Sequence, residues 1–215
     1  MRAPLVIDWD GTVTEVDGLH LVLERFGDLE VFEKSEAALG RTLNLRDVIT
    51  LEFATVHASL ADVVAWVREN VTVRAGFREL ARLRRPLVIS SGFHELIAPV
   101  LAREGIELDV IANRLDPQPK GWRTIFREQP VCDVCGEHCK RADLAALDAF
   151  VYVGDGYSDR CVAKAATRVF ARDGLAAYLA REGVPFEPFE DFYDVERVLA
   201  GADVVPPGRS VGRKT

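Results

Sequence analysis

Two aspartates stand at the end of a short apolar segment near the start of the chain. Residues 3–7 are too few for a helix and rich in Leu, Val and Ile, which is typical of a buried strand. Asp8 and Asp10 follow at once, and residues i and i+2 share one face of a strand, so both carboxylates can lean toward one point. Gly11 lets the backbone turn away closely. This pattern predicts a site for Mg²⁺ and phosphate, although the same residues also form ordinary turns.

A pair of hydroxyl groups follows a second apolar segment, residues 86–89, which we predict to be a strand. Ser90 and Ser91 come next, and a helix is expected over residues 94–103. A hydroxyl beside a helix N-terminus can bind a phosphate oxygen, because backbone N–H groups and the positive end of the helix dipole point there. The alternative is that Ser90 is only an N-cap residue.

A lysine and two further aspartates surround a third apolar segment, residues 150–153, also predicted to be a strand. Lys140 precedes a helix expected over residues 142–147. Asp155 follows the strand between two glycines, and Asp159 opens the next helix. Asp155 would complete an oxygen-ligand set for Mg²⁺, but Asp-Gly is also a common turn.

Residues 14–73 show helical rather than strand periodicity, with apolar residues three and four positions apart. Three or four helices inserted after the first strand indicate a small lid over the site, although they could instead pack on the sheet. Asp17 stands at the start of this insert. It is a candidate for substrate contact, or for the N-cap of the first inserted helix, or for both.

Three cysteines are clustered just before Lys140. Cys132, Cys135 and Cys139 could supply three thiolates to a zinc ion, with either His138 or Cys161 as the fourth ligand. The alternative is a set of partly buried thiols without a metal, because a single Cys-x-x-Cys lacks the usual second pair.

Composition fits a soluble globular protein. The chain has 215 residues, of which 48% are hydrophobic and 28% charged, enough for one core and a small insert. The net charge of −7 disfavours nucleic acid and membrane surfaces as partners, since both need a basic footprint. The sequence shows neither a secretory signal pattern nor an apolar run approaching about 18 residues, so we expect a cytoplasmic location, with thiols used for metal binding or reactivity rather than in disulfides.

Alternating strand and helix signals predict an α/β fold with a doubly wound parallel sheet. The carboxyl ends of its strands would bring Asp8, Asp10, Ser90 and Asp155 to one edge, with Lys140 nearby. Polar groups that follow three separate apolar segments, with a lysine besides, are harder to explain as turn chemistry than any one of them.

In chain order, Asp-Trp-Asp-Gly-Thr, Ser90, Lys140 and Gly-Asp-Gly-x-x-Asp resemble the haloacid dehalogenase superfamily of phosphatases. The insert after the first motif is similar to the phosphoserine-phosphatase-like branch. This implies a Rossmannoid core from residues 1–13 and 74–203, a helical cap over 14–73 and a disordered tail over 204–215. The cysteines and the segments 170–173 and 191–193 are most similar to 2-hydroxy-3-keto-5-methylthiopentenyl-1-phosphate phosphatases of methionine salvage. The cysteine spacing also resembles phosphoethanolamine/phosphocholine phosphatases.

The resemblance implies a phosphoric monoester hydrolase acting on a small-molecule phosphate ester, as a monomer or homodimer. Asp8 would attack phosphorus and become an aspartyl phosphate, while Asp10 would protonate the leaving alcohol and then accept a proton from water. The groups implied to hold phosphoryl oxygens are Ser90, Ser91 and Lys140. The ligands implied for Mg²⁺ are Asp8, Asp10 through its backbone carbonyl, and Asp155, with Asp159 in support.

The cap departs from the phosphoserine enzymes at one position. Asp17 matches an acidic substrate-contacting residue, but Thr50 lies near the place of the arginine that reads the substrate carboxylate, which disfavours phosphoserine. Two rival functions remain. A dehalogenase of the same fold is disfavoured by Asp10, because departure of a halide needs no acid. A non-catalytic binding protein on this fold is disfavoured by the complete set of polar groups.

Overall fold

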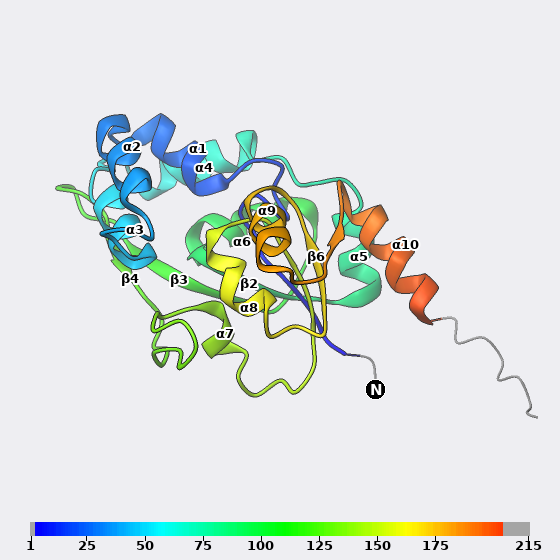
Figure 1. The fold of residues 1–215 in the computed structure, drawn as a ribbon. Coiled ribbons are helices and arrows are strands. Elements are labelled where there is room, and N and C mark those ends of the chain that lie inside the picture. Colours follow the sequence, from blue (N-terminus) through cyan, green and yellow to red (C-terminus); the bar gives the residue numbers. More distant parts are fainter. Residues whose placement is uncertain (1–2, 204–215) are drawn as a thin grey trace, which may run out of the picture.

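A computed structural model describes residues 3–203 and shows a seven-stranded sheet with helices on both faces (Figure 1). The strand order is β4-β3-β2-β1-β5-β6-β7, and every pairing is parallel except that of β3 with β4. The strands are β1 Leu5–Ile7, β2 Leu87–Phe93, β3 Val110–Asp116, β4 Arg123–Ile125, β5 Val151–Gly154, β6 Arg168–Ala171 and β7 Glu187–Pro188. The predicted doubly wound α/β fold is therefore confirmed. The tail predicted over residues 204–215 lies outside the described part of the chain.

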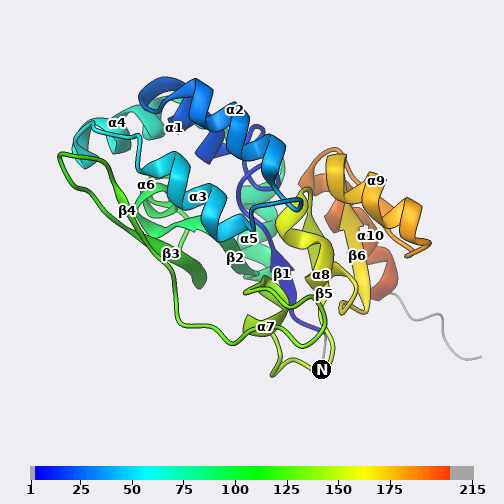
Figure 2. The same ribbon diagram turned by 60° about the vertical axis from the view of Figure 1, so that its left-hand side comes forward.

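Two hydrophobic clusters lie on opposite sides of the sheet, and successive residues of a strand contribute their side chains alternately to one cluster and the other. In β1, Ile7 belongs to one cluster and Val6 to the other, as the two-residue period of a strand requires. The first cluster receives helices α5 Phe77–Arg84, α6 His94–Glu104 and α10 Phe192–Asp203; the second receives α8 Arg160–Ala163 and α9 Asp173–Glu182 (Figure 2). Both faces of the sheet are therefore covered, which suits continuously apolar strands.

Four helices follow β1 and gather at one end of the molecule (Figure 1). Each begins after a residue whose side chain accepts hydrogen bonds from the first turn, which is the usual way to satisfy free N–H groups there. They are α1 Gly18–Phe26, α2 Leu29–Ala38, α3 Leu45–Phe53 and α4 Leu60–Asn70, capped by Asp17, Asp28, Asn44 and Ser59 respectively. Helix α4 contacts α6, and α3 contacts β4, so the insert rests on one end of the sheet.

The chain enters and leaves this insert at one place. Thr14 pairs with Val73 in an isolated antiparallel bridge. Next to it, the buried guanidinium group of Arg74 donates to the carbonyl oxygens of Gly11 and Thr12, both at 2.9 Å, and of Thr14 at 3.0 Å. The loop after Asp10 is therefore hydrogen-bonded directly to the segment by which the chain returns from the insert.

Two elements differ from the sequence-based expectation. Strand β2 does not end before Ser90 but continues to Phe93, which pairs with Asn113 of β3 after a register shift. The helix after Lys140 is short: α7 spans Lys140–Asp143, and the chain then turns at Leu144. Within residues 3–203, no helix is long and apolar enough to cross a bilayer.

Candidate active site

Lys140 links two aspartates at the carboxyl edge of the sheet. Its Nζ lies 2.5 Å from Asp8 Oδ1, just after β1, and 2.7 Å from Asp159 Oδ1, at the end of the 3₁₀ turn Tyr157–Asp159. The Lys140 side chain is only 1% exposed. Burial alone would lower the pKa of Lys140, but the charges of Asp159 and Asp8 outweigh burial and raise it. The lysine is therefore a fixed cation between two carboxylates.

Asp159 acts as an anchor for this lysine. Its Oδ1 also accepts a 2.6 Å hydrogen bond from Tyr152, and its Oδ2 accepts from the backbone N–H groups of Asp155 and Gly156, both at 2.9 Å. Burial would raise the pKa of Asp159, yet Lys140 and the backbone donors lower it. Both oxygens are thus engaged within the protein, so Asp159 supports the site rather than offering a free ligand.

Asp10 sits beside the hydroxyl group of β2. Ser90 Oγ donates to Asp10 Oδ2 at 3.3 Å and accepts from the backbone N–H of Gly92 at 2.8 Å. Removal from solvent and the nearby charge of Asp17 raise the pKa of Asp10 well above its ordinary value. Both causes favour the protonated form of Asp10, which is the form from which a general acid donates.

Asp155 completes an acidic group in which oxygens of Asp8, Asp155 and Asp159 lie within 4.8 Å of one another. Burial and the charge of Asp159 raise the pKa of Asp155 to about 7, although Thr12 Oγ1 donates to it at 2.6 Å. Burial and the same neighbouring charge also raise the pKa of Asp8. Three carboxylates thus face one lysine, a surplus of negative charge and oxygen donors that fits Mg²⁺.

A cavity of about 380 Å³ opens in front of Asp8 and Asp10, and the cap forms its far wall. Ser90 and Ser91 line it from β2. Asp17 lines it as well, while its Oδ1 caps α1 by accepting from Leu19 N at 2.8 Å and His20 N at 3.1 Å. Both alternatives considered for Asp17 are thus compatible with its position.

The cap wall is acidic. Besides Asp17, it carries half-buried Glu36 and buried Glu52, whose Oε1 accepts a 2.9 Å bond from Ser35. Burial raises the pKa of Glu52 to about 7. Among the described residues that line this cavity there is no lysine or arginine, and the one basic side chain is that of His20. This wall would attract a positively charged leaving group more readily than a carboxylate.

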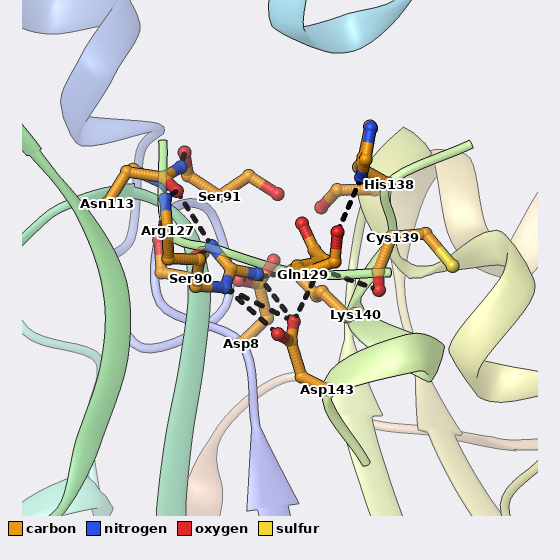
Figure 3. A network of polar contacts seen from close by, with 12 residues as sticks. Asp8, Ser90, Ser91, Asn113, Arg127, Gln129, His138, Cys139, Lys140 and Asp143 are labelled. Atoms are coloured by element: carbon orange, nitrogen blue, oxygen red, sulfur yellow. Dashed lines mark hydrogen bonds and ion pairs between the residues drawn. The ribbon is translucent and has the colours of Figure 1, made fainter. Parts of the chain in front are cut away.

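A second network braces β2, the strand that carries Ser90 and Ser91, and the sequence did not reveal it (Figure 3). Arg127 Nη2 contacts Asp143 Oδ2 at 2.7 Å, and its Nη1 donates to the carbonyl of Ser90 at 3.2 Å. Gln129 Nε2 donates both to Asp143 at 2.7 Å and to the carbonyl of Cys139 at 2.9 Å. The strand carrying Ser90 and the turn carrying Lys140 are therefore joined through one arginine and one glutamine.

Comparison with known families decides the affiliation. The sequence model of the haloacid dehalogenase-like hydrolases matches residues 5–164, which include all the site residues predicted from the first motif to Asp159. The chain belongs to the haloacid dehalogenase-like hydrolases.

Relatives of this hydrolase are similar over nearly its whole length. A 2-hydroxy-3-keto-5-methylthiopentenyl-1-phosphate phosphatase of Exiguobacterium is 27% identical over 95% of the chain and 100% of the relative. The enzyme of the same description from Bacillus thuringiensis is 26% identical over 93% and 96%. Among solved structures, a phosphoserine phosphatase from T. onnurineus has a TM-score of 0.67 at 18% identity, covering 93% of this chain and 94% of that one. The similarity to the phosphoserine phosphatase structure shows that the two proteins share a fold.

Three of the cysteines line, together with Lys140, a different cavity of the hydrolase from the one that Asp8 lines. Ligand atoms of Cys132, Cys135, Cys139 and Cys161 all lie within 4.8 Å of one another, and all four thiols are free. His138 is not part of this group: its Nδ1 lies 2.9 Å from the carbonyl of Gln129. Of the two alternatives for a fourth ligand, the structure brings Cys161 to the cluster.

Proposed function

We propose that this hydrolase is a Mg²⁺-dependent phosphatase that acts on a small phosphorylated metabolite through an aspartyl phosphate. The observation that carries the proposal is the contact of Lys140 with both Asp8 and Asp159, beside a cavity that Asp10 and Ser90 also line. A carboxylate is a poor nucleophile toward a phosphate dianion unless positive charge offsets the repulsion. A buried lysine 2.5 Å from the carboxylate supplies such charge.

The geometry suggests how the residues divide the work. Among the described residues, both donors to Asp8 contact Oδ1: Trp9 N at 2.7 Å and Lys140 Nζ at 2.5 Å. We therefore assign the attack on phosphorus to Oδ2. As the new bond to phosphorus forms, the bond to the leaving alcohol breaks and Asp10 gives that alcohol its proton. Asp10 then takes a proton from the water that attacks the acyl phosphate, releasing phosphate and free Asp8.

Residues suited to hold Mg²⁺ are Asp8 and Asp155, and the family resemblance adds the backbone carbonyl of Asp10. The bound ion would offset the charges of the phosphate and of Asp8. Asp159 would keep Lys140 and the Asp155 backbone in place, through the bonds of 2.7 Å and 2.9 Å described above.

The substrate that the relatives favour is 2-hydroxy-3-keto-5-methylthiopentenyl-1-phosphate. Two of them carry that description and align over nearly their full lengths. Apolar side chains of Leu19, Leu39, Leu45 and Ile49 line the cavity and would suit a methylthio chain. We include in this proposal the cap over residues 14–73 and a cytoplasmic location, where free thiols such as these persist.

The acidic cap wall favours a second candidate, a phosphoethanolamine or phosphocholine phosphatase. Glu36, Glu52 and Asp17 would lie near the leaving group and would stabilise a cationic nitrogen. Phosphoserine fits less well, because its carboxylate would meet the same wall. Thr50, near the place of the phosphoserine-branch arginine, instead contacts Thr124 at 3.1 Å.

One assay tests the reaction class and a second selects the substrate. We expect wild-type protein to hydrolyse p-nitrophenyl phosphate only with Mg²⁺, and Asp8→Asn to be inactive because the amide cannot form the acyl phosphate. Hydrolysis by Asp8→Asn at the wild-type rate would refute the nucleophile, and an inactive wild type would favour a binding protein. A comparison of kcat/KM for the methionine-salvage ester, phosphoethanolamine, phosphocholine and phosphoserine then identifies the substrate.

A further inference from the structure

We propose that Cys132, Cys135, Cys139 and Cys161 bind one zinc ion, which fastens the turn carrying Lys140 to the helix that follows Asp159. The inference goes beyond the phosphatase proposal and is independent of it, because metal content and spectra test it without any substrate. Four separate features support it: the distances between the sulfurs, the backbone turn around Cys132 and Cys135, the charge around the site, and the positions of the cysteines in the chain.

The sulfur spacing matches a tetrahedral metal site. Cys135 Sγ lies 3.5 Å from Cys139 Sγ, and Cys132 Sγ lies 3.9 Å from Cys161 Sγ. Zinc–sulfur bonds of about 2.3 Å in a tetrahedron place neighbouring sulfurs about 3.8 Å apart. A disulfide would need about 2.05 Å. The thiols thus converge as they would around a common centre, without pairing into bonds.

The backbone from Cys132 to Glu137, which includes Cys135, forms a tight turn. Gly136 has φ +72°, the left-handed conformation that glycine adopts without strain. Its N–H donates to the carbonyl of Cys132 at 2.8 Å, and Cys132 N donates to the carbonyl of Glu137 at 2.9 Å. This tight turn holds Cys132 and Cys135 close enough for their sulfurs to share one metal ion.

The other two ligands come from helices. Cys139 directly precedes α7 and stands at the N-terminal end of that helix. Cys161 comes from α8, 22 positions later in the chain than Cys139, so its arrival depends on the fold and not on a local turn. A loop closed over that separation gains stability when a metal joins its ends.

The surrounding charge suits a tetrathiolate. Four thiolates around Zn²⁺ leave a net charge of about −2. A cavity of about 400 Å³ borders three of the cysteines, and Arg160, Lys164 and Lys140 also line it. Thiolates are soft ligands that select zinc over Mg²⁺, so the two metals would not compete for this site.

The position of the site in the chain gives it a role. Cys139 directly precedes Lys140, and Cys161 comes two residues after Asp159, so the metal would brace both sides of the 2.7 Å Lys140–Asp159 contact. α7 has four residues and α8 has four, and such short helices contribute little rigidity by themselves. Lys140 is therefore held by a charged partner on one side and a metal-bound neighbour on the other.

The test begins with protein purified without chelators or metal-affinity resin and analysed by inductively coupled plasma mass spectrometry. We expect about one zinc per chain in wild type and loss of zinc in Cys135→Ser and Cys161→Ser. His138→Ala is the matched control, because His138 lies beside Cys139 in sequence but outside the sulfur cluster, and it should keep its zinc. Since a cysteine variant could fail to fold, wild type exchanged with Co²⁺ gives an independent readout: thiolate-to-cobalt charge-transfer bands and the visible bands of tetrahedral cobalt.

Several results would overturn the proposal. One is wild-type protein that neither contains zinc nor takes it up under reducing conditions. Another is stoichiometric iron in place of zinc, or a Cys135–Cys139 disulfide found after rapid alkylation. If His138→Ala loses zinc and Cys161→Ser keeps it, then His138 is the fourth ligand and the proposed four-cysteine site is wrong.

Discussion

Gly92 lies where one added carbon would displace the carboxyl group that we assign as the general acid. A Cβ built there would stand 2.7 Å from Asp10 Oδ2 and 3.1 Å from Ser90 Oγ. Carbon–oxygen contacts below 3.0 Å are essentially not seen and 3.4 Å is ordinary, so the oxygen would retreat by about 0.3 to 0.7 Å. A misplacement of about 1 Å can cost about 100-fold in rate. We therefore expect Gly92→Ala to lower kcat/KM by about 5- to 30-fold, or about 1–2 kcal/mol.

The loss should depend on how much the leaving group needs a proton. p-Nitrophenolate leaves readily without an acid, whereas the alkoxide of β-glycerol phosphate does not, so Gly92→Ala should impair the alkyl ester more than the aryl ester. Gly156→Ala is the control, because its Cβ meets no atom within 4 Å and its φ of −126° suits alanine. Equal losses on both esters, or the same behaviour in both variants, would refute the assignment of Asp10, provided that the melting temperatures stay similar.

Two further substitutions test the electrostatics of the site. Arg127→Met should cost about 3 kcal/mol in urea unfolding, because it leaves the 9%-exposed Asp143 without its cationic partner. Arg123→Met should cost much less, because Arg123 is 73% exposed and its ion pair with Asp116 is solvated. Equal costs would contradict the bracing role of Arg127. Glu52 has a folded pKa of about 7, above its value in the unfolded chain, so the stability it contributes is complete below about pH 4.5 and lost as the pH rises through 7. Glu52→Gln should therefore gain stability over wild type with rising pH, on the order of 2 kcal/mol by pH 8. Parallel wild-type and variant stability curves between pH 5 and 8 would show that Glu52 is not perturbed.

The predicted site residues that the structure brings together carry local signals in the sequence. Asp8, Ser90 and Asp155 each follow an apolar segment, and the carboxyl ends of these strands share one edge because the strands are parallel. The extension of β2 through Ser90 and Ser91 gave no such signal. Serine and glycine are poor strand formers, and pairing of Phe93 with Asn113 overrides their preference.

Other contacts depend on distances that no local pattern encodes. Arg127 reaches Ser90 across 37 positions, and a lone arginine in a polar segment has no periodicity to mark it. The choice between His138 and Cys161 was open because it depends on how two short helices are oriented. His138 is nearer in sequence to the other thiols, yet its ring is directed to the Gln129 carbonyl.

The pairing of Thr14 with Val73 gives the cap a narrow neck. The insertion begins and ends at neighbouring positions. A different insertion whose two ends lie equally close together could therefore replace it without changing the order or direction of any strand. Arg74 clamps the loop behind Asp10 from the core side of that neck. Under the proposed function, a different insertion would change which leaving groups fit, while Asp8, Asp10 and Lys140 would keep their positions.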